Sequence, residues 1–403
     1  MARPRTGGAT GRLYNRLLVS TDTAVSALSR NAVHLLPESG LEAKLKLGRP
    51  LRVKLGIDVT SPDIHIGRAI PLQRMRAFQD AGHIGVLIVG DYTTRIGDPS
   101  GRSTERPILD PNAIDRDAQT YIEQAMVILD RDRTEVRFNG EWLSTLDFAD
   151  VLRLTRTITV SQILERDDFA NRVQANEPVS VSELLYPLMQ AYDSVAIEAD
   201  LELGGTDQLY NLLAGRTVME AYGLEPQVVL TTPLLLSWDG AKMSSSVGNN
   251  IPLTAPPEEQ FGRTMRIPDE MLEQWWTLVA EQPVPDTDPM DAKLELARVI
   301  VRRSHGEEAA RAAEAHFTRV VREGSAPDDV EERPLPESDP VHLPAVISEA
   351  FGLSTSEARR MIGQGGVKLD GQPVEALDMA REELAGKLLQ AGKRRFVRLV
   401  ASS

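Results

Sequence analysis

The chain has 403 residues, of which 41% are hydrophobic, and a formal net charge of −14. This length exceeds one ordinary domain and suits two or three domains of roughly 100–200 residues, with apolar residues enough for a sizeable core. Cysteine is absent, which excludes disulfide scaffolds, thiolate metal sites and cysteine nucleophiles. The histidines show no metal-ligand spacing and no apolar run is long enough for a membrane span. We therefore expect a soluble, cytoplasmic protein with no metal site of its own.

The first segment, 1–33, is predicted to be an N-terminal extension. Before Asp22 this segment contains four arginines and no acidic residue. Such a composition is compatible with an organellar transit peptide. A frayed, solvated tail of a bacterial protein explains it equally simply, and we favour that interpretation.

The next segment, 34–255, is predicted to be a Rossmann-like domain with a parallel sheet. Residues 51–57 and 85–89 are apolar and β-branched, as in buried strands, and 66–81 between them has helical spacing. Strand, helix and strand in this order form a βαβ unit, the start of a nucleotide-binding α/β sheet. A further strand is predicted at 228–236, and helices at 114–129, 184–192 and 208–222.

Beyond Pro252 the sequence changes character. Helical patterns at 258–265, 269–281 and 290–321 predict a helical domain over 256–323. Residues 324–340 are rich in Asp, Glu, Pro and Ser, which is typical of a solvated linker. A small α+β domain is predicted over 341–403.

Charge is unevenly distributed between these segments. From Val341 to the end, nine Lys and Arg stand against seven Asp and Glu, so this stretch carries +2 and the remainder −16. Attraction to phosphates dominates nucleic-acid affinity, so an acidic chain that binds RNA needs a separate basic region. The distribution favours RNA binding at the C-terminal end.

The first candidate motif, 58–68, follows the first predicted strand and opens the next helix. Such a junction offers free backbone N–H groups and the positive end of a helix dipole to phosphates. His65 and Arg68 would lie on one helix face, and Gly67 leaves room for an adenine or ribose. Taken alone, the motif fits an ordinary capped helix with a surface histidine equally well.

The second candidate motif, 239–249, is a polar, glycine-flanked loop after the predicted strand 228–236. Lys242 on such a loop could reach β- and γ-phosphates and add charge where it accumulates in a transition state. Alone, the sequence would be read as a flexible loop. Together with the first motif, in this order and at this distance, it is specific.

These two motifs resemble the HIGH and KMSKS signatures of class I aminoacyl-tRNA synthetases. Between them, 90–102, 186–193 and 204–208 are similar to the tyrosyl-tRNA synthetases, especially a bacterial branch. The resemblance implies that tyrosine and ATP form tyrosyl-adenylate and pyrophosphate, after which tyrosine is transferred to the 3′ end of tRNA-Tyr. It also implies that Mg²⁺ accompanies ATP and that the protein is a homodimer.

The resemblance assigns roles to individual residues. Catalytic roles fall to Thr60, His65, Arg68 and Lys242, and ATP contacts to Asp58, Gly67, Gly205, Asp207, Lys242 and Ser244. Arg102 and Arg106 are further candidate helpers. Tyrosine contacts fall to Lys54, Thr93, Asp98, Tyr186, Gln190, Asp193 and Gln208. Asp193 would accept a hydrogen bond from the substrate hydroxyl, and phenylalanine would leave that buried carboxylate unpaired.

Several positions depart from the family pattern. Val59 replaces a proline, Arg68 the second histidine of HIGH, Ser245 the second lysine of KMSKS, and Lys54 a tyrosine of many relatives. Two alternatives follow: a catalytically weakened paralogue that binds RNA, or an enzyme that activates another aromatic amino acid. A further hypothesis is that Arg68, a permanent cation, replaces the charge missing at Ser245.

The C-terminal segment resembles the small RNA-binding domain shared by a ribosomal small-subunit protein and pseudouridine synthases. A capped helix is predicted at 353–362, and a turn, a short strand and a second turn at 365–371. Arg359, Arg360 and Lys368 would contact RNA phosphates rather than read bases.

Overall fold

The computed structural model describes residues 21–59, 63–99, 111–245, 247–322, 330–392 and 395–401. Contacts divide the chain into two compact units. The first runs to Thr254 and includes Glu270–Val284, while the second comprises Ala255–Asp269 and the chain from Pro285 onward. None of the described helices is long and apolar enough to cross a membrane.

The first unit is built on a six-stranded sheet with the order β1-β6-β5-β2-β3-β4. All neighbouring strands are parallel except β1, which runs antiparallel to β6. The chain moves outward in one direction from β2 and in the other from β5, so the order reverses between these two strands. Open α/β sheets bind ligands at the carboxyl ends of such a switch point. The strands are β1 (His34–Leu36), β2 (Arg52–Ile57), β3 (Ile84–Val89), β4 (Thr134–Phe138), β5 (Leu201–Gly205) and β6 (Val228–Thr232).

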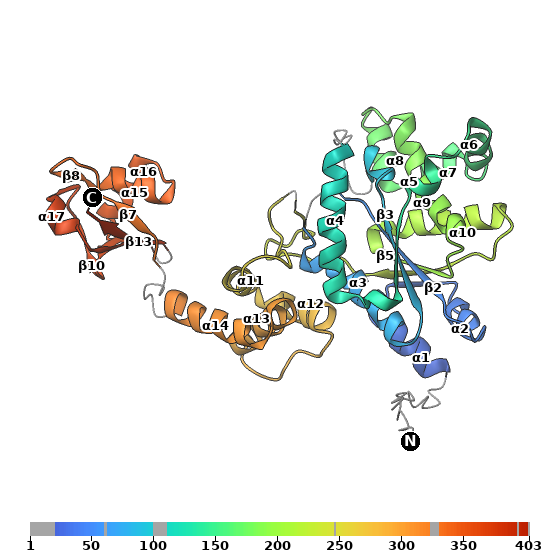
Figure 1. Cartoon of the computed structure of the whole chain (residues 1–403), viewed down its shortest axis with the longest axis horizontal. Coiled ribbons are helices and arrows are strands. Elements are labelled where there is room, and N and C mark those ends of the chain that lie inside the picture. Colours follow the sequence, from blue (N-terminus) through green and yellow to red (C-terminus); the bar gives the residue numbers. More distant parts are fainter. Residues whose placement is uncertain are drawn as a thin grey trace, which may run out of the picture. The chain divides into compact units, whose positions relative to one another are not determined.

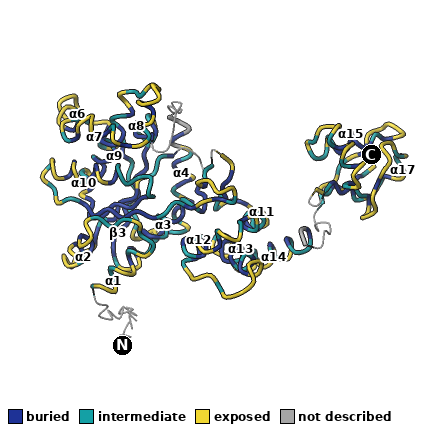
Figure 2. Tube along the Cα trace, turned by 180° about the vertical axis from the view of Figure 1, so that it is seen from behind, coloured by how far each residue is buried: buried dark blue, intermediate teal, exposed yellow. Residues whose placement is uncertain are grey.

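Helices cover both faces of this sheet (Figure 1). On one face lie α3 (Ile66–Asp80) and α4 (Pro111–Ile128), and on the other α9 (Val181–Ala196) and α10 (Leu209–Ala221). The buried residues follow the sheet, as the dark tube in Figure 2 shows. Alternate strand residues point to opposite faces, so Val53 and Leu55 join the core under α3 while Lys54 faces α9. The predicted Rossmann-like fold is confirmed.

Short helices complete the first unit. Three of its helices, α6, α7 and α9, begin with a reciprocal cap in which an Asp, Thr or Ser side chain accepts from the third residue of the helix. The remaining helices and turns are α1 (Thr21–Leu28), α2 (Gly40–Leu45), η1 (Thr93–Arg95), η2 (Arg131–Arg133), α5 (Gly140–Leu143), α6 (Phe148–Thr155), α7 (Val160–Ile163), α8 (Asp167–Gln174), η3 (Thr206–Gln208), η4 (Asp269–Met271, which starts at the unit boundary), α12 (Leu272–Trp275) and η5 (Trp276–Ala280).

Two sequence predictions for these regions are wrong in detail. The strand predicted at 228–236 ends at Thr232, because Pro233 cannot donate to the sheet ladder. The helix predicted at 269–281 divides into η4, α12 and η5, and most of it belongs to the first unit rather than to the predicted helical domain.

The second unit begins with a helical cluster. It contains α11 (Pro257–Thr264), α13 (Pro289–His305), α14 (Glu307–Phe317) and η6 (Thr318–Arg322). Phe261, Leu294 and Phe317 belong to its buried core. The single long helix predicted at 290–321 is wrong, because Gly306 adopts a φ of 88° and ends α13 there.

The C-terminal part is a small α+β module with its own core, as predicted. A five-stranded sheet has the order β10-β9-β12-β13-β7, and β11 pairs with β8. The strand β7 lies within the predicted linker 324–340 and runs parallel to β13, so the folded module starts earlier than residue 341. Its elements are β7 (Glu332–Pro334), β8 (Val341–His342), α15 (Leu343–Phe351), α16 (Thr355–Gly363), β9 (Val367–Leu369), β10 (Gln372–Pro373), β11 (Asp378–Met379), α17 (Arg381–Leu384), β12 (Leu388–Ala391) and β13 (Arg395–Val400).

Candidate active site

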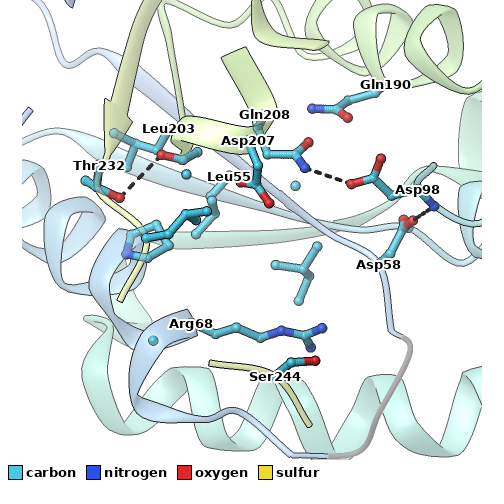
Figure 3. A pocket seen from close by; sticks show the side chains of 18 of the residues that line it. Leu55, Asp58, Arg68, Asp98, Gln190, Leu203, Asp207, Gln208, Thr232 and Ser244 are labelled. Atoms are coloured by element: carbon cyan, nitrogen blue, oxygen red, sulfur yellow. Dashed lines mark hydrogen bonds between the residues drawn. The ribbon is translucent and has the colours of Figure 1, made fainter. Parts of the chain in front are cut away.

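A cavity of about 940 Å³ opens at the carboxyl ends of the central strands. Residues of both sequence motifs line it, together with residues that follow β3, β4 and β5. Figure 3 shows Arg68 and Ser244 on one side of the cavity and Gln190, Gln208 and Asp98 on the other. Its polar lining comprises Asp58, His65, Arg68, Thr93, Thr94, Asp98, Tyr121, Asn139, Tyr186, Gln190, Asp193, Asp207, Gln208, Thr232, Lys242, Ser244 and Ser245.

His65 caps α3 at the cavity wall. Its Nδ1 accepts a hydrogen bond from the backbone N–H of Arg68 at 3.3 Å, and the imidazole is buried. Burial, followed by the charges of Arg68 and Lys242, lowers the pKa of His65 to about 3. The ring is therefore neutral at pH 7, and Nε2 carries the proton because Nδ1 accepts. His65 can offer a phosphate a hydrogen bond but no positive charge.

Arg68 supplies a permanent charge on the same side. Its guanidinium carbon lies 5.9 Å from the ring centroid of Tyr121, and burial raises the pKa of that tyrosine. In Figure 3 the side chain extends along the cavity toward Ser244 of the second motif. Arg68 and Ser244 thus lie on the same side of one cavity, and the charge-replacement hypothesis stays a prediction.

Gly67 is constrained by the protein itself. A Cβ at this position would lie 3.2 Å from the His65 ring and 3.6 Å from Leu235 Cβ. The glycine therefore lets the histidine fold back against the helix start, and this role adds to the predicted room for a nucleotide.

The second motif forms a loop whose described residues are 239–245 and 247–250, and we call it the lysine loop. Asn249 is buried within the loop and holds it together. Its side-chain amide donates to both carboxylate oxygens of Asp239 and to the carbonyl of Lys242. Its side-chain oxygen accepts from the backbone N–H of Ser244 at 2.8 Å. Met243 anchors the loop in the protein core. Lys242 itself remains 53% exposed, and its Nζ lies 2.5 Å from Asp207 Oδ2.

Asp207 follows β5, where two glycines shape the cavity wall. A Cβ at Gly205 would lie 2.7 Å from Asp207 Oδ1 and 2.8 Å from Leu234 Cδ2. A larger residue would displace the carboxylate that pairs with Lys242. The position of the Asp207 carboxylate therefore requires a glycine at 205, and both residues are predicted to contact ATP.

Asp58 connects residues predicted for both substrates. Its carboxylate accepts hydrogen bonds from Thr93 Oγ1 at 2.8 Å, Tyr186 Oη at 3.0 Å and the backbone N–H of Asp98 at 3.2 Å. The Asp98 carboxylate in turn accepts from Gln208 Nε2 at 2.7 Å (Figure 3). Asp58, which the resemblance assigns to ATP, thus organises three residues that it assigns to tyrosine.

Asp193 lines the cavity and is 2% exposed. Its Oδ1 accepts from Trp142 Nε1 at 2.8 Å and its Oδ2 from Asn139 Nδ2 at 3.4 Å. Burial raises the pKa of Asp193 to about 7, opposed by Lys54 and by these two donors. A buried carboxylate with two neutral donors and an open cavity side is suited to accept a bond from a hydroxyl.

Trp142 and Asn139 were not identified from the sequence. Asn139 directly follows β4 and therefore lies at the ligand-binding edge of the sheet, where a polar residue is a usable signal. Trp142 lies on the four-residue helix α5, and its side chain reaches Asp193 only through tertiary packing.

Lys54 is placed differently from the prediction. Of the described residues predicted to contact tyrosine, it alone does not line the cavity. It is fully buried beneath α9 and forms an ion pair with Glu202 at 3.0 Å. Lys54 is therefore not positioned to contact a ligand in the cavity.

Other predictions fall outside the cavity or outside the described residues. Thr60, Arg102 and Arg106 belong to segments that the structure does not describe. In the C-terminal module, Arg359 and Arg360 are exposed on α16, and Lys368 lies on β9. His342 Nε2 lies 3.3 Å from Arg359 Nη2, while its Nδ1 lies 2.7 Å from Asp378 Oδ1. Across the described segments, no group of three or more His, Asp and Glu is arranged to hold a metal.

Comparison with known proteins agrees with the motifs. The family model for class I tRNA synthetases of the W and Y type matches residues 46–322. This chain belongs to that family. It is 44% identical over 394 residues to a tyrosine–tRNA ligase of Thermotoga maritima, covering 94% of this chain and 98% of the relative. A tyrosine–tRNA ligase of Moorella thermoacetica is 47% identical over 390 residues, covering 92% and 94%. The predicted family and enzyme class are confirmed.

Solved structures resemble about three quarters of the chain. Tyrosyl-tRNA synthetase from Archaeoglobus fulgidus, complexed with L-tyrosine, superposes with a TM-score of 0.61 at 23% identity, covering 73% of this chain and all of that one. The enzyme from Pyrococcus horikoshii gives 0.57 at 17% identity, covering 74% and 96%. At these identities the likeness supports the fold alone.

Proposed function

We propose that the chain is a tyrosine–tRNA ligase whose cavity holds tyrosine at the Asp193 end and ATP at the end lined by His65, Arg68 and Lys242. The observation that carries this assignment is the buried Asp193, which opens into the same cavity as both signature motifs. Relatives named for this activity cover nearly the whole chain, which supports the same conclusion.

The tyrosine end offers partners for the phenol and for the α-ammonium group of the amino acid. Asp193 would accept the hydrogen bond from the phenol, because its other contacts come from Trp142 and Asn139. The α-ammonium would lie among oxygen atoms of Asp98, Tyr186 and Gln190. Phenylalanine would leave Asp193 desolvated and unpaired on its cavity side, which disfavours its binding.

Activation of tyrosine at the ATP end of the cavity requires positioning and positive charge rather than a general base. A carboxylate oxygen of tyrosine attacks the α-phosphorus of ATP while the bond to the β-phosphate oxygen breaks and pyrophosphate leaves. Arg68 and Lys242 would stabilise the charge that accumulates on the leaving group, and neutral His65 would donate a hydrogen bond. Lys242 is exposed enough to exchange Asp207 for a phosphate at little cost.

Mg²⁺ would enter with ATP. The cavity carboxylates Asp58, Asp98 and Asp207 already accept hydrogen bonds or an ion pair from protein groups. ATP oxygens and water would therefore supply most ligands of the ion, in keeping with the way Mg²⁺ binds at nucleotide sites.

A homodimer is supported by an exposed apolar surface on α6–α9. Exposed apolar side chains lie on each of these helices, and buried side chains of the same helices share one core. Phe148 is 77% and Val181 75% exposed, which is typical of an uncovered interface. The exposed set is Phe148, Leu152, Val160, Val173 and Val181. Val181→Asp should yield monomers in analytical ultracentrifugation; an unchanged sedimentation coefficient would argue against this interface.

RNA binding would fall to the C-terminal module. Arg359 and Arg360 are exposed on α16, which Ser354 caps, and exposed positive side chains suit phosphate contacts. The pairing of His342 with Asp378 and Arg359 would fix the direction of that arginine.

ATP–pyrophosphate exchange with a panel of amino acids tests the function. Exchange that depends on tyrosine supports the proposal. Exchange with another aromatic amino acid would indicate a different substrate, and the absence of exchange with every amino acid would indicate a non-catalytic paralogue.

A further inference from the structure

Lys54 and Glu202 form an ion pair beneath the tyrosine end of the cavity. They are direct partners in the register between β2 and β5, and both side chains are 0% exposed. Removing two charges from water is costly, and their attraction repays it only when further hydrogen bonds complete the pair. The residues that complete this pair therefore indicate its role.

The hydrogen bonds that the pair makes with α9 all fall on one turn of that helix, while Gln227 Nε2 also donates to Glu202. Lys54 Nζ donates to the carbonyl of Gln190 at 2.8 Å and to Ser194 Oγ at 2.7 Å. Glu202 accepts from Gln190 Nε2 at 3.2 Å and from Ser194 Oγ at 3.4 Å. Asp193 lies between these two contacts on the same turn. The ion pair thus holds the segment that carries two of the predicted tyrosine contacts.

Glu202 determines the orientation of the Gln190 amide. A carboxylate accepts hydrogen bonds and so takes the donor end of the amide, which leaves the amide oxygen for other partners. Gln190 lines the cavity, and an oxygen is the atom that an α-ammonium group requires. The amide is therefore oriented for an amino acid before the substrate arrives.

Lys54 provides the positive charge that favours an ionised Asp193. The charged groups that act on Asp193 are Lys54 on β2 and Glu202 on β5, while Trp142 and Asn139 contribute neutral donors. Burial raises the pKa of Asp193, Lys54 lowers it, and Glu202 raises it by less than Lys54 lowers it. An ionised carboxylate forms a stronger bond with a phenol O–H than a protonated one.

We propose that the Lys54–Glu202 pair is a specificity-determining element of the tyrosine site. It orients Gln190 through Glu202 and keeps Asp193 a hydrogen-bond acceptor through Lys54. Both members are positioning residues, because neither lines the cavity. The inference rests on the proposed function and adds to it the source of the selectivity for a phenol.

The test compares the wild type with the double variant Lys54→Met/Glu202→Gln, which removes both charges together and avoids an isolated buried ion. An amide at position 202 can pair with either end of Gln190, so the orientation is no longer fixed. We expect the KM for tyrosine to rise about tenfold. The acid limb of the pH profile, which is the fall in kcat/KM for tyrosine at low pH, should move to higher pH. The KM for ATP should stay unchanged.

The single variant Glu202→Gln retains Lys54, so its pH profile should shift in the direction opposite to that of the double variant. Removing the negative charge should move the acid limb to lower pH, a response that a purely structural role would not produce. Because this variant leaves the buried Lys54 charge without its carboxylate partner, circular dichroism is used to show that it folds before its pH profile is measured. An acid limb that does not move in Glu202→Gln would overturn the inference.

A matched control is Lys44→Met, the same substitution at another buried lysine far from the cavity. Its partner Asp200 keeps Arg49 at 2.7 Å, so no carboxylate is left unpaired. If the double variant and this control have the same tyrosine KM and acid limb, the pair is only structural. If the wild type itself shows no tyrosine-dependent exchange, the proposed function fails instead.

Discussion

Lys242 of the second motif and Asp207, which follows β5, form an ion pair of 2.5 Å at the cavity wall. The pair joins the lysine loop to the turn after β5. Because the lysine side chain is half exposed, its attraction to Asp207 adds little to stability. The same lysine can therefore transfer to a more highly charged partner, such as a polyphosphate.

Lys242→Ala should reduce the kcat of tyrosine-dependent pyrophosphate exchange by about 10²–10³-fold, the effect typical of losing one transition-state contact. The KM for tyrosine should change little, since Lys242 lies at the other end of the cavity. Steady-state exchange kinetics measure both quantities. Arg76→Ala is a suitable control, because it removes a cation from another exposed ion pair, with Asp80, at a site that does not line the cavity. Equal losses in the two variants would refute a specific role.

Arg68 and Ser245 should be coupled if the arginine replaces the missing second lysine of the motif. Both line the cavity, and Arg68 extends toward the lysine loop. Arg68→His should lower the kcat of exchange about tenfold or more, and adding Ser245→Lys should restore much of it. Ser245→Ala alone should have little effect. A double-mutant cycle on exchange rates measures the coupling, and purely additive effects would disprove it.

The elevated pKa of Asp193 should appear in the pH dependence of stability. Between pH 3.8, its ordinary pKa, and about 7, the folded state keeps a proton that the unfolded chain has lost. This contribution to stability is complete below pH 3.8 and is lost as pH rises toward 7. Asp193→Asn has no such carboxyl group. The free energy of unfolding of the variant minus that of the wild type should therefore increase by a few kcal/mol from about pH 4 to about pH 8.

Urea unfolding followed by tryptophan fluorescence measures this difference, because Trp142, Trp238, Trp275 and Trp276 all belong to the first unit. His65 contributes the opposite slope below its ordinary pKa of 6.5, but it is present in both proteins and cancels. Leu213→Ala, an exposed change on α10, should keep a constant difference from the wild type at all pH values. A constant difference for Asp193→Asn as well would mean that its pKa is not raised.

Local patterns predicted the sheet and the motif positions well. The βαβ unit at β2, α3 and β3 was found because its apolar runs and helical spacing arise within one continuous segment. The motif residues His65, Arg68 and Lys242 line one cavity because strand order brings the carboxyl ends of β2 and β6 close to that of β5.

What sequence reasoning missed depends on tertiary structure. Lys54 was expected at the substrate, yet its partner Glu202 lies far along the chain and becomes its neighbour only through strand pairing. Trp142 reaches Asp193 in the same non-local way. The break at Gly306 was missed because a glycine within a helical pattern is often tolerated, and only its backbone conformation decides.

Removal of the C-terminal module should separate the two half-reactions. A chain that ends at residue 329 lacks the whole α+β module, and the cavity lies entirely in the first unit. Pyrophosphate exchange should remain within about twofold of the full chain, because no contact to the reacting groups is removed. Charging of tRNA-Tyr should fall by at least about 10²-fold, since the phosphate contacts of the module are lost.

The choice of end point matters for this experiment. A chain that ends at Pro340 keeps β7 but loses its partner β13, and exposes Leu335, whose N–H bonds the carbonyl of Val400. The longer fragment should therefore be more prone to aggregate than the shorter one, as light scattering would show. Loss of pyrophosphate exchange in the shorter fragment would mean instead that the module supports the fold of the catalytic part.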